Sequence, residues 1–96
     1  GDVYKRQIYE HPSVREASVF GIPDERLGEK LATRISLNPG AELSEEDLSS
    51  FLAAKIAKFK IPEYTWFQAE ELPKVAAGKI AKKQMREDAI KELGLD

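Results

Sequence analysis

The spacing of the apolar residues changes along this chain, and that change limits what it can fold into. From Leu31 to Leu37 every second side chain is apolar or Thr, which is the period of a β-strand with one buried face. From residue 48 onward the spacing becomes helical, in the apolar stripe Leu48, Phe51, Leu52, Ile56 and Phe59. A chain with both periods must pack helices on a sheet, so we expect an α+β fold.

Turn-forming residues and apolar runs delimit the remaining elements. A short N-terminal helix should end near Glu10, because the residue before Pro12 is pushed out of the helical region. Apolar runs predict strands over 14–22 and 64–69, and helical spacing predicts a last helix over about 80–93. The expected architecture is a small three-stranded, mainly antiparallel sheet packed by two main helices plus the short N-terminal helix.

The clearest local signals mark the two main helices. Ser44 is a favourable N-cap with Asp47 at N3, and Pro62 stops the helix that follows. We expect this helix to run toward Pro62 and to place Lys55, Lys58 and Lys60 near its C-terminus. The last helix should bury the stripe Met85, Ala89 and Leu93, with Gly94 just beyond its end.

Composition excludes several kinds of site. With 96 residues the chain forms at most one domain, and 42% hydrophobic and 33% charged residues are typical of a folded one. Cysteine is absent and His11 is the only histidine, which excludes disulfides, thiolate nucleophiles and His-rich metal clusters. The net charge of -2 argues against a protein committed to nucleic acid by bulk charge. A chain this poor in catalytic residue types is more typical of a module than of a whole enzyme.

Two further absences bear on location. No apolar run approaches the ~20 residues that a membrane span needs, and residues 1–7 do not resemble a signal peptide. We therefore expect a cytoplasmic protein without a membrane span.

One loop stands out as a candidate site. Residues 73–79 have the form P-x-x-x-x-G-K, with Pro73 at one end and Lys79 at the other. The small residues Ala76, Ala77 and Gly78 would let another surface approach the backbone, and the lysine could neutralise a carboxylate or phosphate oxygen. On spacing alone, a solvated turn before a helix explains this loop better. A phosphate-binding P-loop is excluded, because it needs a further glycine upstream and Ser or Thr after the lysine.

Basic residues are concentrated in the second half of the chain. The stretch 58–86 is net +4, from the cations Lys58, Lys60, Lys74, Lys79, Lys82, Lys83 and Arg86 against three glutamates. The simplest interpretation is a solvated helix face, and the functional one is attraction for phosphates. The aromatic residues Tyr64, Trp66 and Phe67 are expected to pack in and around the core, and not to stack on bases.

Four segments together resemble a known family. They are 8–14 (IYEHPSV), 19–29 (VFGIPDERLGE), 58–62 (KFKIP), and 72–74 (LPK) with 78–80 (GKI). In this order and spacing they resemble the small C-terminal domain of the adenylate-forming acyl-CoA synthetases, over about residues 8–89. Each segment alone is a weak signal, and the set is specific.

The resemblance implies a two-step reaction and a role for one lysine. A carboxylic acid and MgATP give an acyl-adenylate and pyrophosphate, and a thiol, usually CoA, then takes the acyl group. Lys79 matches the family lysine that enters the active site of a large N-terminal domain during the first step. Pro73, Ala76, Ala77 and Gly78 would support it, and Ala77 stands where the family often has Ser.

The second half-reaction implies other residues of this domain. After adenylation the small domain of the family rotates and helps to form the CoA channel. That places Leu27, Gly28, Phe59 and Lys60 near CoA. ATP, Mg and CoA are thus expected in the full-length enzyme, with none bound tightly by this fragment and no metal site in it. The expected partners are the large N-terminal domain in cis and a fatty or related carboxylic acid, and not nucleic acid.

Two expectations concern the extent of the domain. Residues 1–7 fit the family poorly and are interpreted as a possible expression or sequence-assembly scar, so that 8–96 form the mobile C-terminal domain. Without the large domain we expect this fragment to be inactive alone. The alternative is a non-catalytic binding or regulatory module that uses the basic 58–86 region.

Overall fold

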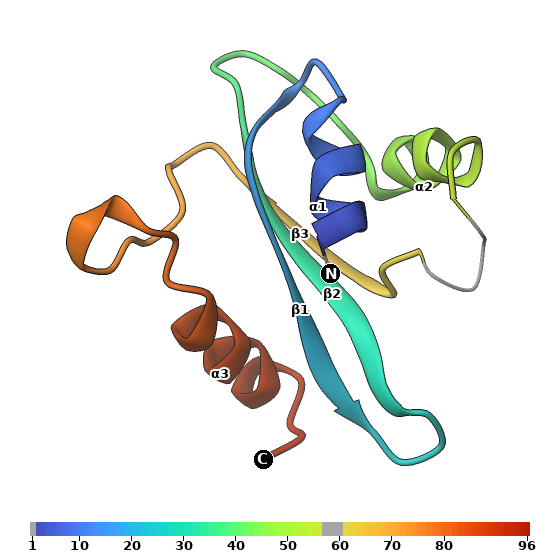
Figure 1. The fold of residues 1–96 in the computed structure, drawn as a ribbon, viewed down its shortest axis with the longest axis vertical. Helices are drawn as coiled ribbons and strands as arrows, with labels where there is room; N and C mark the ends of the chain where they lie inside the picture. The colour runs from blue at the N-terminus through green and yellow to red at the C-terminus, as the bar shows by residue number, and fades with distance from the viewer. Residues whose placement is uncertain (1, 57–60) are drawn as a thin grey trace.

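The computed structural model describes residues 2–56 and 61–96 and shows an α+β fold, as the apolar periods predict (Figure 1). The helices and strands follow in the order α1 (Asp2–Tyr9), β1 (Val14–Asp24), β2 (Gly28–Leu37), α2 (Glu45–Ala53), β3 (Tyr64–Gln68) and α3 (Lys82–Glu92). A 3₁₀ turn, η2 (Ala76–Gly78), lies between β3 and α3. In this part of the chain no helix is long and apolar enough to cross a membrane.

The three strands form one mixed sheet in the order β1-β2-β3. The hairpin β1–β2 is antiparallel, with Val19 opposite Thr33, whereas β2 and β3 run parallel, with Thr33 opposite Thr65. Parallel neighbours need a crossover, and α2 lies within it. The longer pairing is antiparallel, which confirms the prediction of a mainly antiparallel sheet.

Helices cover both faces of this sheet, so the molecule has two small cores. Alternation along β1 sends Ala17 and Val19 to one face and Phe20 and Ile22 to the other. The first core lies under α1 and α2, and its buried members are Tyr4, Ile8, Val14, Ala17, Val19, Ile35, Leu48 and Leu52. The second lies under α3, and its buried members are Phe20, Ile22, Ala32, Leu72, Met85 and Ala89.

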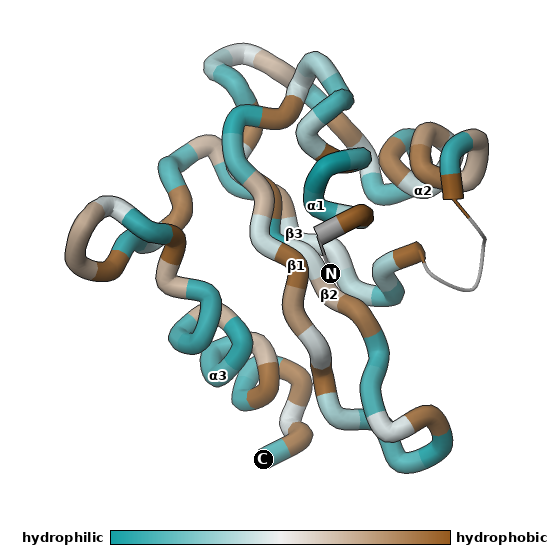
Figure 2. The backbone as a smooth tube through the Cα atoms, viewed as in Figure 1, coloured by the Kyte–Doolittle hydropathy of each residue, from teal (hydrophilic) through white to brown (hydrophobic). Residues whose placement is uncertain are grey.

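Side-chain packing in both cores follows the predicted stripes. Met85 and Ala89 are buried, Leu93 packs beside them, and Gly94 follows with a positive φ of 71°. Figure 2 shows α3 as mainly hydrophilic, as expected for a helix that buries one narrow stripe. Tyr64 and Trp66 pack against the second core and Phe67 against the first, as expected for packing residues.

The end of α2 differs from the prediction. Ser44 caps its start as predicted, since the Asp47 N–H donates to Ser44 Oγ at 3.0 Å. The helix stops at Ala53, however, and does not continue toward Pro62. The Lys55 N–H bonds back to the Leu52 carbonyl, which tightens the last turn, and its ammonium pairs with Glu10 at 2.9 Å. Lys58, Phe59 and Lys60 lie outside the described residues.

Two other boundaries shift by a few residues. β1 continues through Pro23 to Asp24, because it is an edge strand and the missing N–H of proline is tolerated there. α3 begins at Lys82 instead of Ile80, because Ile80 pairs with Lys74 in an isolated antiparallel bridge.

The N-terminal segment takes part in the fold. α1 begins at Asp2, the Tyr4 side chain is only 6% exposed, and Ile8 is fully buried. The interpretation of residues 1–7 as a scar stays a prediction. In this structure the segment supplies Tyr4, one of the largest side chains of the first core.

Candidate functional site

The segment Pro73–Lys79, here called the lysine loop, is a closed turn with a hydrogen-bonded base. The Ala81 N–H donates to the Pro73 carbonyl at 2.8 Å, and the Val75 N–H donates to the Lys79 carbonyl at 2.7 Å. These bonds join the two ends of the loop as in a short hairpin. The backbone of Lys79 is therefore held in place, while its side chain remains exposed.

The tip of the lysine loop has an unusual backbone. Ala77 has φ 67° and ψ 16°, in the left-handed region, and Gly78 follows with φ 74°. Glycine adopts this region without a steric penalty, whereas an alanine there costs about 1–2 kcal/mol. Every residue from 73 to 79 is exposed, so the small tip offers its backbone to any surface that approaches.

A partly buried carboxylate holds the base of this loop. Glu16 Oε1 accepts from the Leu72 N–H at 2.9 Å, and Glu16 Oε2 pairs with Lys74 Nζ at 2.7 Å. Lys74 Nζ also donates to the Leu72 carbonyl at 2.9 Å. Burial by itself raises the pKa of Glu16, but the hydrogen bonds from Lys74 and Leu72, with the charges of Lys74 and Arg15, hold it below the ordinary value of 4.5.

A β-bulge aims this carboxylate at the loop. The register of the hairpin shifts between Val14 and Glu16, so that Arg15 is an extra residue in β1. Val14 and Ala17 therefore both enter the first core, and the two residues between them point to the opposite face. There Arg15 donates to the Ala69 carbonyl at 2.6 Å, and Glu16 holds residues 72–74.

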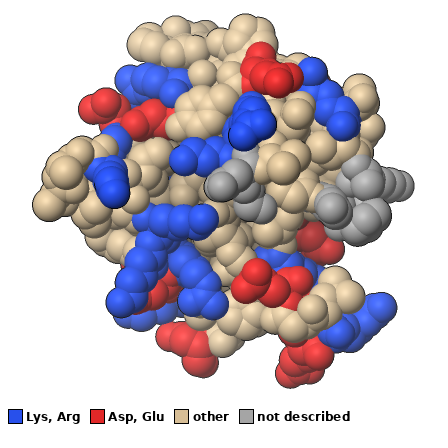
Figure 3. All heavy atoms as spheres, viewed as in Figure 1, with Lys and Arg blue, Asp and Glu red and all other residues tan. Residues whose placement is uncertain are grey.

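Cations gather along β1 beside the lysine loop. One hollow is lined by Lys5, Lys79 and Lys82 over residues 17–19 of β1. A second is lined over residues 19–21 by the cations Lys82, Lys83 and Arg86, with Glu29 as its one acidic residue. Figure 3 shows Lys and Arg side chains gathered over α3 and toward the middle of this face. We call the surface lined by the five cations the basic groove; they are Lys5, Lys79, Lys82, Lys83 and Arg86.

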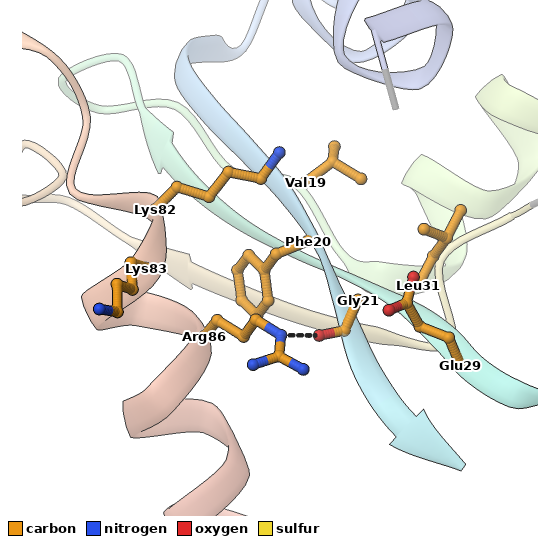
Figure 4. Close-up of a pocket in the computed structure, with 8 residues that line it drawn as sticks. All are labelled: Val19, Phe20, Gly21, Glu29, Leu31, Lys82, Lys83 and Arg86. Atoms are coloured by element: carbon orange, nitrogen blue, oxygen red, sulfur yellow. Dashed lines mark hydrogen bonds between the residues drawn. The ribbon is translucent and has the colours of Figure 1, made fainter.

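Figure 4 shows how the residues of α3 contribute to the basic groove. Lys82 extends across β1 toward Val19, and Lys83 points away from the strand. Arg86 reaches down to β1, where its Nε donates to the Gly21 carbonyl at 2.9 Å. Arg86 thus ties α3 to the sheet, and no ion pair of Lys5, Lys79, Lys82 or Lys83 occurs within residues 2–56 and 61–96.

The turn at Leu27 and Gly28 forms a separate surface at the far end of the hairpin (Figure 1). Asp24 accepts from the Leu27 N–H at 2.8 Å and pairs with Lys30 at 3.4 Å. The Leu27 hydrogen bond and the contact with Lys30 lower the pKa of Asp24 below its ordinary value, against the opposing effect of desolvation. Leu27 is 65% exposed, and Gly28 has φ 80°, which suits the tight turn.

The structure thus separates the residues that the sequence singles out. It places Pro73, Ala76, Ala77, Gly78 and Lys79 in one loop beside β1, and it leaves Leu27 and Gly28 in the turn at the far end of the hairpin. Phe59 and Lys60 lie outside the described residues.

Sequence reasoning misplaced Lys74 and missed Lys5, Arg15 and Glu16, all of which lie near the lysine loop. Lys74 turns to Glu16 and does not join the other cations of the basic stretch. Lys5, in the segment interpreted as a scar, lines the basic groove. Arg15 and Glu16 were not singled out, because no local signal shows that a bulge turns both toward one face.

The chemistry available here is that of an exposed ammonium on a pre-ordered loop. Such a group can bind an anion and orient it, and it can stabilise negative charge that develops nearby. The described residues contain no group of three or more His, Asp or Glu that could hold a metal ion.

Comparison with known proteins points to one family. The model of the AMP-binding enzyme C-terminal domain matches residues 6–79. The medium-chain acyl-CoA ligase ACSF2 of Danio rerio, a mitochondrial protein, is 39% identical over 88 residues, which are 92% of this chain and 14% of that protein. A long-chain-fatty-acid–CoA ligase of Bacillus subtilis is 34% identical over 91 residues, which are 91% of this chain and 16% of the ligase.

A solved structure agrees with these sequence matches. ATP-bound MatB from Rhodopseudomonas palustris superposes with a TM-score of 0.85 at 28% identity, over 96% of this chain and 18% of that one. The chain therefore spans less than a fifth of the length of each of these relatives.

Proposed function

Since this chain belongs to the AMP-binding enzyme C-terminal domain family, we propose that it is the C-terminal domain of an ATP-dependent acid–CoA ligase. The proposed substrate is a fatty acid or a related carboxylic acid, by analogy with the acyl-CoA ligases that it resembles. One observation supports this function best: Lys79 stands exposed on a loop whose backbone is hydrogen-bonded at its base and small at its tip.

We assign the adenylation step to Lys79. In this step a carboxylate oxygen attacks the α-phosphorus of ATP, a P–O bond forms, and pyrophosphate leaves with the electrons of the broken P–O bond. The Lys79 ammonium holds the carboxylate against the phosphate and stabilises the charge that develops between them. Ala76, Ala77 and Gly78 allow the loop to enter a narrow site, because they present almost no side chain.

We assign the thioester step to another face of the domain. The thiol sulfur attacks the acyl carbon and gives up its proton to solvent, a C–S bond forms, and AMP leaves with the electrons of the broken C–O bond. Leu27 and Gly28, with Phe59 and Lys60, are proposed to lie near CoA in this step. Lys79 lies beside residues 17–19 of β1, away from the Leu27–Gly28 turn at the far end of the hairpin, and this separation supports alternate use of two faces by rotation of the domain.

The nucleotide and metal sites belong, in this proposal, to a large N-terminal domain in cis. ATP supplies the adenylyl group and CoA the thiol, and the large domain would hold Mg. Cytoplasmic location also stays part of the proposal, although the ACSF2 relative is mitochondrial.

The role of Lys79 is tested by separating the half-reactions in the full-length ligase. We expect Lys79→Ala to lower adenylation, measured as acid-dependent ATP–pyrophosphate exchange, by roughly 10²–10³-fold, or about 3–4 kcal/mol. Thioester formation from supplied acyl-adenylate should survive. Lys91→Ala, an exposed lysine in the last turn of α3, is the matched control and should leave both rates unchanged. Equal loss in both half-reactions would refute the role given to Lys79.

A second experiment tests whether the chain acts only as part of a larger enzyme. We expect the 96-residue chain alone to form no acyl-CoA above background from acid, ATP, Mg and CoA, because it supplies one lysine and part of a channel. Addition of the separate N-terminal domain should restore measurable product. Turnover by the chain alone would overturn the proposed division of labour.

The basic groove supports a second candidate function, a non-catalytic module that binds nucleic acid or a protein partner. Five cations, from α1, the lysine loop and α3, line it. A nucleic-acid ligand predicts binding that weakens steeply as salt rises, because phosphate contacts release counterions. The ligase proposal predicts no measurable binding to single-stranded or duplex nucleic acid at physiological salt.

A further inference from the structure

We propose that Glu16 is a positioning residue for Lys79, acting through its contacts with Leu72 and Lys74 at the base of the lysine loop. The inference rests on the proposed role of Lys79 in adenylation. We call the contacts among Glu16, Leu72 and Lys74 the clasp.

The clasp ties the base of the lysine loop to β1. Both carboxylate oxygens of Glu16 are used, one by the Leu72 N–H and one by Lys74 Nζ. The Glu16 side chain is 17% exposed, against 47% for Glu10 and 52% for Glu63 in other ion pairs of the described chain. A charge pair that is partly removed from water and hydrogen-bonded on both oxygens holds its geometry better than an exposed pair.

Short backbone contacts connect the clasp to the reactive lysine. Lys74 pairs with Ile80 across the base of the loop, and the Val75 N–H bonds to the Lys79 carbonyl at 2.7 Å. A displacement of Lys74 therefore moves the backbone of Lys79. The rest of the loop is exposed, so few other contacts resist the movement.

Because of the β-bulge, strand β1 can hold the segment 69–74 at two points. Arg15 holds the Ala69 carbonyl, and its neighbour Glu16 holds Leu72 and Lys74. Without the extra residue, these neighbours would point to opposite faces of the sheet. Bulges commonly aim a side chain in this way.

Steady-state kinetics of the full-length ligase test the proposal. Glu16→Gln keeps an acceptor for Leu72 but removes the charge, and Lys74→Met removes the other partner. Both should lower kcat for adenylation about tenfold with the KM values for ATP and acid nearly unchanged, since a small misplacement of a charge acts on the transition state. Thioester formation from supplied acyl-adenylate should be unaffected. The control Glu10→Gln removes the ion pair with Lys55, away from the loop, and should change neither rate.

A double variant separates positioning from general damage to the fold. In a Lys79→Ala background, Glu16→Gln should produce no further loss of adenylation, because its effect passes through Lys79. A full additional tenfold loss, or an equal loss in the thioester step, would show that Glu16 acts only on stability or elsewhere.

Hydrogen exchange gives a readout that does not depend on activity. In Glu16→Gln the amides of Val75 and Ala81, which close the loop, should exchange faster, while that of Leu93 in α3 should not. Unchanged exchange at Val75 and Ala81 would contradict the clasp even if activity falls. If Lys79→Ala has normal adenylation activity, the proposed function is wrong. If Lys79→Ala loses adenylation but Glu16→Gln keeps normal adenylation, only the role proposed for Glu16 is wrong.

Discussion

Ala77 is the one residue other than glycine with a positive φ in the part of the chain that the structure describes. Its φ of 67° lies in the left-handed region, next to Gly78 at 74°. Such strain is retained only where the surrounding structure fixes the backbone, and it is often stored near functional residues. Here Lys79 follows two residues later, and the bonded base of the lysine loop fixes the turn.

Two substitutions at the tip should have opposite effects on stability. Ala77→Gly removes the steric penalty, although the unfolded chain gains freedom, so we expect a rise of about 0.5 kcal/mol in the free energy of unfolding. Gly78→Ala introduces the penalty and should lower it by about 1 kcal/mol or more. Urea denaturation of the 96-residue chain measures both values. Shifts of the same sign would contradict two consecutive left-handed residues.

The helix α1 contributes to the core, although the sequence analysis interprets most of it as a possible scar. It packs on β1 and inserts Tyr4 and Ile8 into the first core. The Tyr4 hydroxyl is buried without a hydrogen-bond partner in the part of the chain that the structure describes, and burial raises the pKa of this phenol. The ring thus stabilises the domain, while its hydroxyl costs free energy.

Substitutions at Tyr4 measure these two effects separately. Tyr4→Phe keeps the ring and removes the unpaired hydroxyl, so stability should rise by about 1 kcal/mol. Tyr4→Ala leaves a cavity and should cost about 3–5 kcal/mol. The exposed neighbour provides the control, and Lys5→Ala should stay within about 0.5 kcal/mol. A negligible effect of Tyr4→Ala in thermal unfolding would mean that residues 1–7 do not stabilise the domain.

For the whole molecule, acidic groups link the separate parts of the fold. Glu16 joins β1 to the lysine loop, and Asp24 holds the turn of the hairpin. Both carboxyls have pKa values below the ordinary ones of 4.5 and 3.8. A carboxyl with a lowered pKa in the folded state contributes stability at higher pH, which is lost as the pH falls through that folded value.

We therefore expect the domain to be destabilised by acid, with full stability above about pH 5 and a progressive loss below pH 4.5. The charged groups that act on Glu16 are Lys74 and Arg15. Denaturation midpoints measured between pH 7 and pH 3 test this. The difference between the wild-type chain and Glu16→Gln should shrink toward pH 3, and a constant difference would contradict the linkage.

Most of the fold follows from local signals in the sequence. The alternation in 31–37, the Ser44 cap and the inward stripe of α3 all predict elements that the structure confirms. Lys79 is singled out by its loop pattern, which is equally local. Element ends are less well predicted, because a contact such as that of Lys55 with Glu10 joins residues 45 positions apart.

The sequence by itself determined the period of each element, and through that the α+β class and the exposed lysine of the loop. Only the tertiary structure decided what holds that lysine. The Leu72–Glu16 bond spans 56 residues, and it exists because a bulge turns Arg15 and Glu16 to the same face. Strand register and contacts between distant segments depend on the whole packed sheet, which no local pattern of residues contains.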